Sequence, residues 1–292
     1  SVNNSLVCYL LESFASDFIK ENYLSKLTTG EKLGAFSLSE PQSGSDASNM
    51  KTIAKKVGDD YVVSGTKNWV TSGINCDYVI LFAVTKQGIG HKGVSAFVVD
   101  KEWEGFSCGK PENKLGIRAS DTCELYFDNV KIPKENLIGE EGMGFKIALA
   151  TLDGGRIGIA AQALGIAQAS LDASISYSKE RIQFGKPISA NQGIQFKLAD
   201  MAMEIEASRL IIRQAAYLKD KHLNFGPMAS MAKVYASETA MKASTNCVQI
   251  HGGNGYMRET GVERLMRDAK ITQIYEGTSE IQRVVIARGL LN

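Results

Sequence analysis

Hydrophobic and polar positions follow three successive patterns along the chain. Residues 5–18 place apolar side chains at helical spacing, and residues 23–27 predict a short second helix before Thr29-Gly30. From about residue 33 to residue 132 the pattern becomes that of short strands. After Pro133, helical spacing returns. We therefore expect an α+β fold with a partial N-terminal helical segment, a middle antiparallel β-domain and a C-terminal four-helix bundle.

The middle region consists of short β-rich runs separated by turn residues. Gly58-Asp59-Asp60 is expected to join the first two strands as a hairpin. In the last strand, Cys123, Leu125 and Phe127 alternate with charged residues, as in a strand buried on one face. The predicted strands cover residues 52–57, 61–64, 78–84, 94–99 and 123–130.

Four helices are expected after the β-domain. The first has a possible break at Gly154-Gly155, and Ser189 with Gln192 forms a capping box that opens the second. Pro227 suits the first turn of the third helix, which Gly252-Gly253 would stop. The expected spans are residues 143–180, 189–220, 227–252 and 279–291, and the expected domains are residues 1–32, 33–133 and 134–292.

The segment Ile274–Gln282 carries the most specific chemistry. Ser279 with Gln282 has the spacing of a capping box, so a helix is expected to begin there. Gly277 lets the backbone turn sharply just before that helix. Glu276 would then lie on a turn between apolar neighbours, where loss of water raises the pKa of a carboxyl group and strengthens it as a base. A solvated loop glutamate is the alternative.

Two motifs in the β-domain suggest a site for an anion or a flat heterocycle. Residues 38–46 combine hydroxyl residues with Gly and Pro in a turn whose amides and hydroxyls could hold such a group. Trp69 and Thr71 lie on the same face of a predicted strand, which suits stacking on a flavin ring beside a hydrogen-bond donor. A polar loop and a core tryptophan are the structural alternatives.

Three further residues have both a structural and a functional interpretation. Arg156 lies beside the expected helix break and could pair with a charged ligand, as could Arg181, but helix arginines are usually solvated. His251, which precedes Gly252-Gly253, is more often a structural residue than a ligand.

Composition excludes several classes of function. The chain has 33 basic and 32 acidic residues, so it offers no broad basic surface for nucleic acid. Its 5 cysteines form no C-x-x-C pair and its 3 histidines are isolated, which favours free thiols in a reducing compartment and no metal site. No apolar run reaches the ~18 residues of a membrane span. The sequence also lacks the Rossmann and P-loop motifs and any targeting pattern.

Taken in order, these segments resemble the acyl-CoA dehydrogenase family, and most closely its short-chain, butyryl-CoA-like members. The resemblance implies the same succession of helical domain, β-domain and four-helix bundle. It begins inside the family's N-terminal helical domain, so we expect the chain to be truncated at its N-terminus. The matching segments are residues 37–46, 69–71, 114–118, 142–145, 181–185, 249–255 and 274–282.

The resemblance also implies roles for individual residues. Glu276 would remove the α-proton of an acyl-CoA thioester, and Gly277 would lie against the substrate. Some members place the base at the position held here by Gly155, which cannot serve. The coenzyme A portion would contact Ser45, Asp153 and Arg156. The implied FAD contacts are Phe36, Leu38, Ser39, Ser45, Trp69, Thr71, Phe184, Thr278 and Glu280, with Arg181, Gln192, Gln249, His251, Gly252 and Gly253 reaching the FAD of a neighbouring subunit.

The implied reaction is FAD-dependent α,β-dehydrogenation of a short-chain acyl-CoA to trans-2-enoyl-CoA, as in fatty acid β-oxidation. The flavin N5, which Thr71 would reach, accepts the β-hydrogen as hydride, and the electrons pass to an electron-transfer flavoprotein. The implied assembly is a homotetramer, a dimer of dimers, in the bacterial cytoplasm or the mitochondrial matrix. An acyl-CoA oxidase using O2 and a flavin-binding or structural fragment without turnover remain open.

Overall fold

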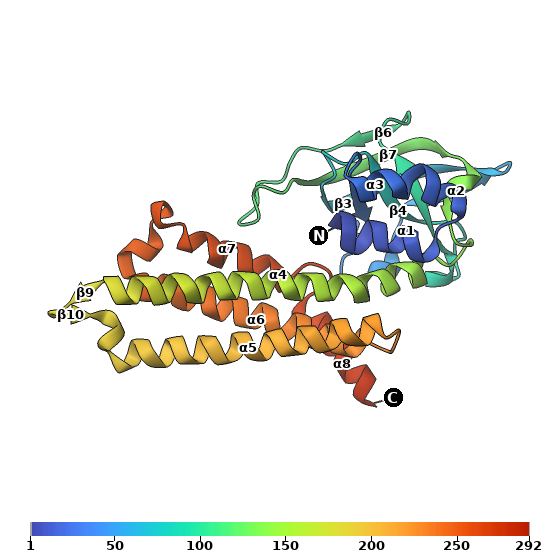
Figure 1. Cartoon of the computed structure of the whole chain (residues 1–292). Coiled ribbons are helices and arrows are strands. Elements are labelled where there is room, and N and C mark those ends of the chain that lie inside the picture. Colours follow the sequence, from blue (N-terminus) through green and yellow to red (C-terminus); the bar gives the residue numbers. More distant parts are fainter. Residues whose placement is uncertain (1, 292) are drawn as a thin grey trace. The chain divides into compact units, whose positions relative to one another are not determined.

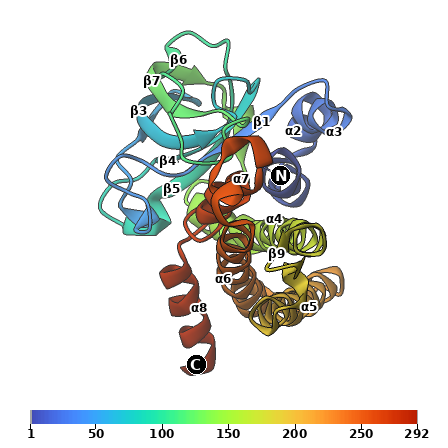
Figure 2. The ribbon, with the colours of Figure 1, turned by 90° about the vertical axis from the view of Figure 1, so that its left-hand side faces the viewer.

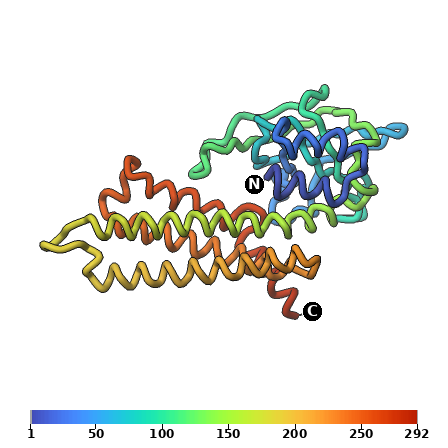
Figure 3. The backbone as a smooth tube through the Cα atoms, in the orientation of Figure 1, coloured from blue at the N-terminus to red at the C-terminus, as the bar shows by residue number. Residues whose placement is uncertain are grey.

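The computed structural model describes residues 2–291, which form two compact units. Unit 1 contains residues up to 113 and residues 118–155, and unit 2 contains residues 114–117 and those from 156 onward. Unit 1 is a twisted sheet with short helices beside it, and unit 2 is a set of long helices, as the ribbon and the chain trace both show (Figures 1 and 3).

Short helical segments open unit 1. The helix expected over residues 5–18 ends early, because Ala15 is extended with a ψ of 155°. The Ser16 hydroxyl then accepts a hydrogen bond from the N–H of Ile19 and starts a new helix. The segments are a π-helical turn at Val2–Cys8, α1 (Tyr9–Phe14), α2 (Asp17–Ile19), a second π-helical turn at Lys20–Leu24, and α3 (Ser25–Thr29).

An eight-stranded sheet forms the body of unit 1, in the order β6-β7-β3-β2-β4-β5-β8, with β1 beside β4. All five predicted strands are present, and the β2–β3 hairpin is confirmed. The sheet is mixed rather than antiparallel throughout, because β4 pairs in parallel with β1 and with Ile53 of β2. The strands are β1 (Gly34–Ser37), β2 (Ile53–Val57), β3 (Asp60–Thr71), β4 (Tyr78–Val84), β5 (Val94–Asp100), β6 (Phe106–Cys108), β7 (Thr122–Ile132) and β8 (Leu137–Ile138).

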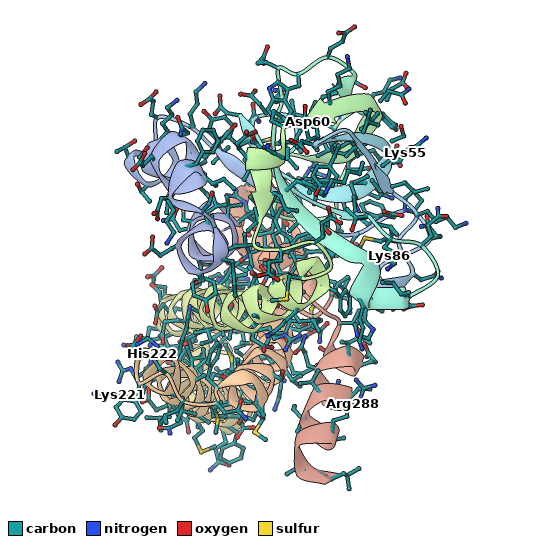
Figure 4. The ribbon with its side chains drawn as sticks, turned by 90° about the vertical axis from the view of Figure 1, so that its right-hand side faces the viewer. Lys55, Asp60, Lys86, Lys221, His222 and Arg288 are labelled. Carbon is teal, nitrogen blue, oxygen red and sulfur yellow. The ribbon has the colours of Figure 1, made fainter. Side chains whose placement is uncertain are left out.

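The two faces of this sheet bury separate hydrophobic cores. Ile80 and Phe82 of β4 pack with the N-terminal helices, whereas Val79 and Leu81 point to the opposite core. This central strand is therefore buried on both faces, which explains why its sequence is an unbroken apolar run. Charged side chains such as Lys55, Asp60 and Lys86 lie at the outer surface of the unit (Figure 4).

A buried ion pair joins β3 to the loop after β1. Lys67 Nζ lies 2.8 Å from Glu40 Oε1, and the two side chains are 0% and 2% exposed. Lys67 also donates to the carbonyl of Leu38, and Glu40 accepts the N–H groups of Lys51 and Thr52. Burial alone would raise the pKa of Glu40, but these partners outweigh it and lower the pKa to about 2. The pair therefore fixes the loop between β1 and β2 to β3.

Unit 2 is a helical bundle joined by short turns, and Figure 2 shows its long helices nearly end-on, with the C-terminal helix seen from the side. The first helix runs without a break through Gly154-Gly155, contrary to expectation, since a glycine costs a helix only about 1 kcal/mol. The elements are α4 (Gly144–Glu180, entering unit 2 at Arg156), β9 (Ile182–Gln183), β10 (Lys186–Pro187), α5 (Gln192–Asp220), α6 (Gly226–His251), α7 (Val262–Thr272) and α8 (Ser279–Leu291). Among the described residues no helix combines the length and apolarity that a membrane span requires.

The four-helix core is confirmed, but its fourth helix is not the expected one. Residues of α4, α5 and α6 pack with Ala269 of α7, a helix that the sequence analysis did not predict. Helix α7 carries many charged residues and buries only Val262, Ala269 and Thr272, but its apolar and charged positions separate clearly at helical spacing, so its sequence did contain the signal of an amphipathic helix. The expected helix α8 is present and contacts α6, but within the described residues it adds nothing to this buried cluster.

Both expected capping boxes are wrong. Helix α5 begins after Asn191 without a side-chain cap, and Ser189 lies in a 3-10 turn before it. At α8 the hydroxyl of Thr278, not Ser279, accepts the N–H of Ile281, at 3.3 Å. The signals at α6 are confirmed: a proline lies in its first turn, and a glycine with a φ of 59° ends it.

Replacing Lys67 with Met should lower the free energy of unfolding by about 3–5 kcal/mol, because Glu40 would become an unpaired buried carboxylate. Adding Glu40→Gln should recover part of that loss, since it removes the unpaired buried charge, while its single amide oxygen can replace only one of the two carboxylate oxygens that accept the N–H groups of Lys51 and Thr52. Denaturant titration of wild type, both single variants and the double variant measures this. A loss below about 1 kcal/mol in Lys67→Met would mean that the pair behaves as a solvated one.

Candidate active site

In unit 1, the expected cofactor residues lie on two adjoining segments. The carbonyl of Ser39 accepts the N–H of Asn68 at 2.9 Å, which joins the loop after β1 directly to the end of β3. Leu38 is buried, whereas Ser45 is exposed near the tip of the loop. The structure therefore places Leu38 and Ser39 beside the strand end that carries Trp69 and Thr71, with Phe36 in β1 just before them and Ser45 farther along the loop.

Trp69 lies at an irregularity in β3. The register with β7 shifts between Lys67 and Val70, and Trp69 has a φ of 60°, a left-handed backbone that a bulky residue rarely adopts. Its side chain is 62% exposed while Val70 is buried, so the core-packing alternative for Trp69 is wrong. A strained backbone that holds an indole outward beside the partly exposed Thr71 offers a surface for stacking.

In unit 2, Glu276 lies on the turn between α7 and α8. Its φ is 53° and that of Gly277 is 90°, so both residues are left-handed. Lys233 Nζ donates to the carbonyl of Gly277 at 2.7 Å. Gln282 Nε2 donates to the carbonyls of Glu276 and Gly277, each at 3.1 Å. Since Lys233 and Gln282 are both 0% exposed, the turn is held from inside the protein.

The carboxyl group of Glu276 is withdrawn from water. The residue as a whole is partly exposed, but Oε2 is inaccessible and accepts no hydrogen bond from the described residues. Burial raises the pKa of Glu276 to about 7, while the positive charges of Lys233 and Arg156 oppose the rise. The alternative of a solvated loop glutamate is therefore wrong, and the group is suited to acid–base chemistry near neutral pH.

Arg156 is buried as well, at 5% exposure, and its Nη1 donates to the hydroxyl of Ser230 at 3.2 Å. A solvated helix arginine is therefore the wrong interpretation of Arg156, although it fits the exposed Arg181. Asp153 precedes Arg156 by one turn of α4 and belongs to unit 1. The structure thus divides the residues expected to contact coenzyme A between both units.

Phe184 lies at the tip of the β9–β10 hairpin. It has a φ of 51° and its side chain is 99% exposed, so the ring has no packing role within this chain. Arg181, just before the same hairpin, and Gln192, at the start of α5, are also exposed. These three residues form an outward-facing group at the end of unit 2 that carries the β9–β10 hairpin.

The end of α6 exposes backbone. The ring of His251 stacks on Tyr177 with centroids 4.2 Å apart, and its Nδ1 lies 2.8 Å from the carbonyl oxygen of Cys247, so packing explains this histidine. At Gly252 and Gly253, no atom lies within 4 Å of where a Cβ would be. The peptide groups there, next to the exposed Gln249, are open to a ligand.

The sequence analysis missed Lys233 and assigned Gln282 only a capping role. Lys233 lies on a face of α6 that otherwise carries small residues, with Ala229, Ala236 and Ala240 all 0% exposed. A lysine at helical spacing among small buried residues was the available signal, because a charge in such a place needs a polar partner. Within residues 2–291, no three His, Cys, Asp or Glu side chains lie together in a way that could hold a metal ion.

Comparisons with known proteins agree along the chain. The family description "Acyl-CoA dehydrogenase, middle domain" matches residues 35–130, and "Acyl-CoA dehydrogenase, C-terminal domain" matches residues 142–291. An acyl-CoA dehydrogenase of Bacillus subtilis (strain 168) is 52% identical over 291 residues, covering 100% of this chain and 77% of that protein. The mitochondrial short-chain specific acyl-CoA dehydrogenase of Rattus norvegicus is also 52% identical, with 100% and 71% covered. The solved butyryl-CoA dehydrogenase of Megasphaera elsdenii matches with a TM-score of 0.98 and 50% identity, over 99% of this chain and 76% of that one.

Glu276→Gln should raise the free energy of unfolding at about pH 8 by up to about 3 kcal/mol. With a raised pKa, the folded chain keeps a proton that the unfolded chain loses above its ordinary pKa, so stability falls as the pH rises toward 7. The difference should shrink to less than about 1 kcal/mol at ~pH 5, where the unfolded chain is only partly ionised. Denaturant titrations at the two pH values measure it; equal stabilities at the higher pH would mean that Glu276 is solvated.

Proposed function

This chain belongs to the acyl-CoA dehydrogenase family of oxidoreductases, and on that premise we propose that it converts a short-chain acyl-CoA thioester to the trans-2-enoyl-CoA, with Glu276 as the base. The observation that carries this proposal is the inaccessible carboxyl oxygen of Glu276 and its pKa of about 7. The short-chain substrate is supported by relatives described as short-chain specific and as butyryl-CoA dehydrogenase, at 50–52% identity.

The raised pKa of Glu276 fits the proton that it would remove. An α-proton of a thioester is weakly acidic, so an ordinary carboxylate is a poor match for it, whereas a base with a pKa near 7 is stronger and still ionised in part at neutral pH. The backbone N–H of Glu276 would donate to the thioester oxygen and stabilise the negative charge that develops there. The left-handed backbone of Glu276 fixes the direction of this N–H. The same residue would therefore bind the thioester oxygen and remove the α-proton.

FAD is the proposed cofactor, and when bound it accepts the β-hydrogen as hydride. The residues present fit such a group: the outward indole of Trp69 beside the hydroxyl of Thr71 suits a flat ring, and the open backbone at Gly252-Gly253 suits a phosphate. The further contacts proposed for it are Phe36, Leu38, Ser39, Ser45, Arg181, Phe184, Gln192, Gln249, His251, Thr278 and Glu280. For the acyl-CoA we propose Ser45, Asp153, Arg156 and Gly277.

We further propose that electrons leave to an electron-transfer flavoprotein. A solved structure described as the electron transferring flavoprotein of Acidaminococcus fermentans contains a chain 48% identical to this one, with a TM-score of 0.98 over 99% of this chain and 76% of that one. The bacterial and mitochondrial relatives support the bacterial cytoplasm or the mitochondrial matrix as the compartment.

A homo-oligomer is the proposed assembly, and the outer face of α5 supports it. Apolar side chains recur there at seven-residue intervals, and each is more than half exposed; they are Phe196, Met203, Leu210 and Tyr217. A heptad seam of this kind is suited to packing against a helix of another subunit. Phe184, Leu290 and Leu291 are still more exposed, which adds to the apolar surface that a partner subunit would cover.

Glu276→Gln should retain bound flavin but slow its reduction by butyryl-CoA at least about a hundredfold, since the amide cannot accept the α-proton. In wild type, the rate should fall about tenfold per pH unit below about 7 and level off above it, because only the ionised carboxylate acts as a base. Anaerobic stopped-flow absorbance across a pH series measures both. Unchanged reduction by the variant would remove Glu276 from the proposal.

Leu210→Asp should dissociate the oligomer, because a carboxylate would be buried in the seam. Ala202→Asp, at an exposed position on another face of the same helix, is the matched control. Sedimentation velocity should give a smaller species for Leu210→Asp alone, with lower flavin content if Arg181 and Gln192 serve a neighbouring subunit. An unchanged sedimentation coefficient would show that this seam is not the interface.

A further inference from the structure

We propose that Lys233 and Gln282 are the positioning residues of the base, Gln282 by fixing the turn that carries Glu276 and Lys233 by fixing the turn and also favouring the ionised carboxylate. This inference rests on the proposed role of Glu276 and adds to it the groups that make the residue effective. Neither residue belongs to the expected catalytic, cofactor or substrate contacts.

The geometric part concerns two carbonyl groups. The carbonyl of Gly277 accepts both Lys233 Nζ at 2.7 Å and Gln282 Nε2 at 3.1 Å, and the same amide group reaches the carbonyl of Glu276. A left-handed backbone at a non-glycine residue costs of order 1–3 kcal/mol unless its surroundings hold it. These three hydrogen bonds provide that hold, because losing a buried partner of a carbonyl also costs about 1–3 kcal/mol.

The side chain of Gln282 lies so close to Gly277 that the turn has no room for a larger residue there. A Cβ on Gly277 would lie 2.5 Å from Gln282 Nε2, so only glycine lets the amide approach both carbonyls. The turn thus requires glycine for its φ of 90° and again for the contact beneath it. The orientation of the Glu276 carboxyl group is therefore set by side chains on α6 and α8, not by the turn sequence alone.

The electrostatic part concerns the charge of Lys233. Its side chain is completely buried, and no carboxylate of the described residues lies within ion-pair distance of it. Burial lowers the pKa of Lys233 to about 8, and the carboxylate that most opposes this is Glu276, ahead of Glu280 and Glu238. A methionine would fill the same space without the cost of burying a charge, so packing alone does not explain a lysine here.

The charge of Lys233 acts in turn on Glu276. Burial raises the pKa of Glu276, and Lys233 is the largest opposing influence, followed by Arg156 on α4. The neighbouring hydroxyl of Tyr275 is turned to Gln162, to which it donates at 2.6 Å, and it does not bind the carboxyl group. Without the ammonium group, the base would keep its proton to higher pH and would be mostly neutral at pH ~7.

Lys233→Met in the flavin-loaded full chain tests the electrostatic part. The carboxyl carbon of Glu276 in 13C-glutamate-labelled protein can be assigned by its absence in Glu276→Gln, and its chemical shift titrates directly. In Lys233→Met the midpoint should move up by at least about one pH unit, and the midpoint of the flavin-reduction rate should move with it. Lys242→Met is the matched control, because Lys242 lies on the same helix but is exposed and pairs with Glu204.

Gln282→Met separates position from charge. It removes one of the two donors beneath the turn and leaves the ammonium group, so the midpoint should stay within about 0.3 pH units while the limiting rate at high pH falls about tenfold or more. Lys233→Met should instead recover much of its rate at high pH, because Gln282 still holds both carbonyls.

Three results would overturn the inference: an unchanged Glu276 midpoint in Lys233→Met, an equal change in Lys242→Met, or an unaltered limiting rate in Gln282→Met. Loss of helical circular dichroism in both Lys233→Met and the smaller change Lys233→Gln would assign Lys233 to folding and overturn it as well. The carboxyl titration does not depend on turnover. It therefore stays informative if Glu276→Gln reduces flavin normally, a result that would contradict the proposed function instead.

Discussion

The hydrogen bond from the Lys233 ammonium group to the carbonyl of Gly277 is the interaction on which the site in unit 2 depends. It links a helix of the bundle core to the turn that carries Glu276, and it places a positive charge in the same dry environment as the carboxyl group. Lys233 thus acts on Glu276 in two ways: with Gln282 it fixes the turn, and its charge limits the rise in pKa that burial causes. Burying both charges lowers the free energy of unfolding, and packing elsewhere in the bundle offsets that loss, as is common for functional sites.

Unit 1 uses a buried lysine in a related way. Lys67 fixes the loop after β1 through the carbonyl of Leu38 and through Glu40, and that loop joins the strand end that carries Trp69. The difference lies in the counter-charge. Glu40 is a full ion-pair partner with its pKa lowered to about 2, whereas Glu276 stays unpaired with its pKa raised to about 7. One carboxylate is therefore structural, and the other is left available for chemistry.

Much of the architecture could be predicted from local pattern. Alternation in β7, the apolar run of β4 and the glycine that ends α6 each reflect a short-range rule, and each is confirmed. The failures arise where tertiary contacts decide. Neither S-x-x-Q pair forms a capping box, and β1 pairs with β4, which lies 44 residues later in the chain. Helix α7 is a different case: its apolar and charged positions separate at helical spacing, and we overlooked it. Glu276 could be singled out from its turn, but Lys233 lies forty-three positions earlier, and only the fold brings its ammonium group to Gly277.

Removal of the α-proton by Glu276 is the central claim, and isotope exchange at carbon 2 of the substrate tests it most directly. Butyryl-CoA incubated anaerobically with the flavin-loaded protein in D2O, then examined by mass spectrometry, should gain deuterium at carbon 2 with wild type and not with Glu276→Gln. Equal deuterium uptake with both proteins would show that another group removes the proton, and it would contradict the account.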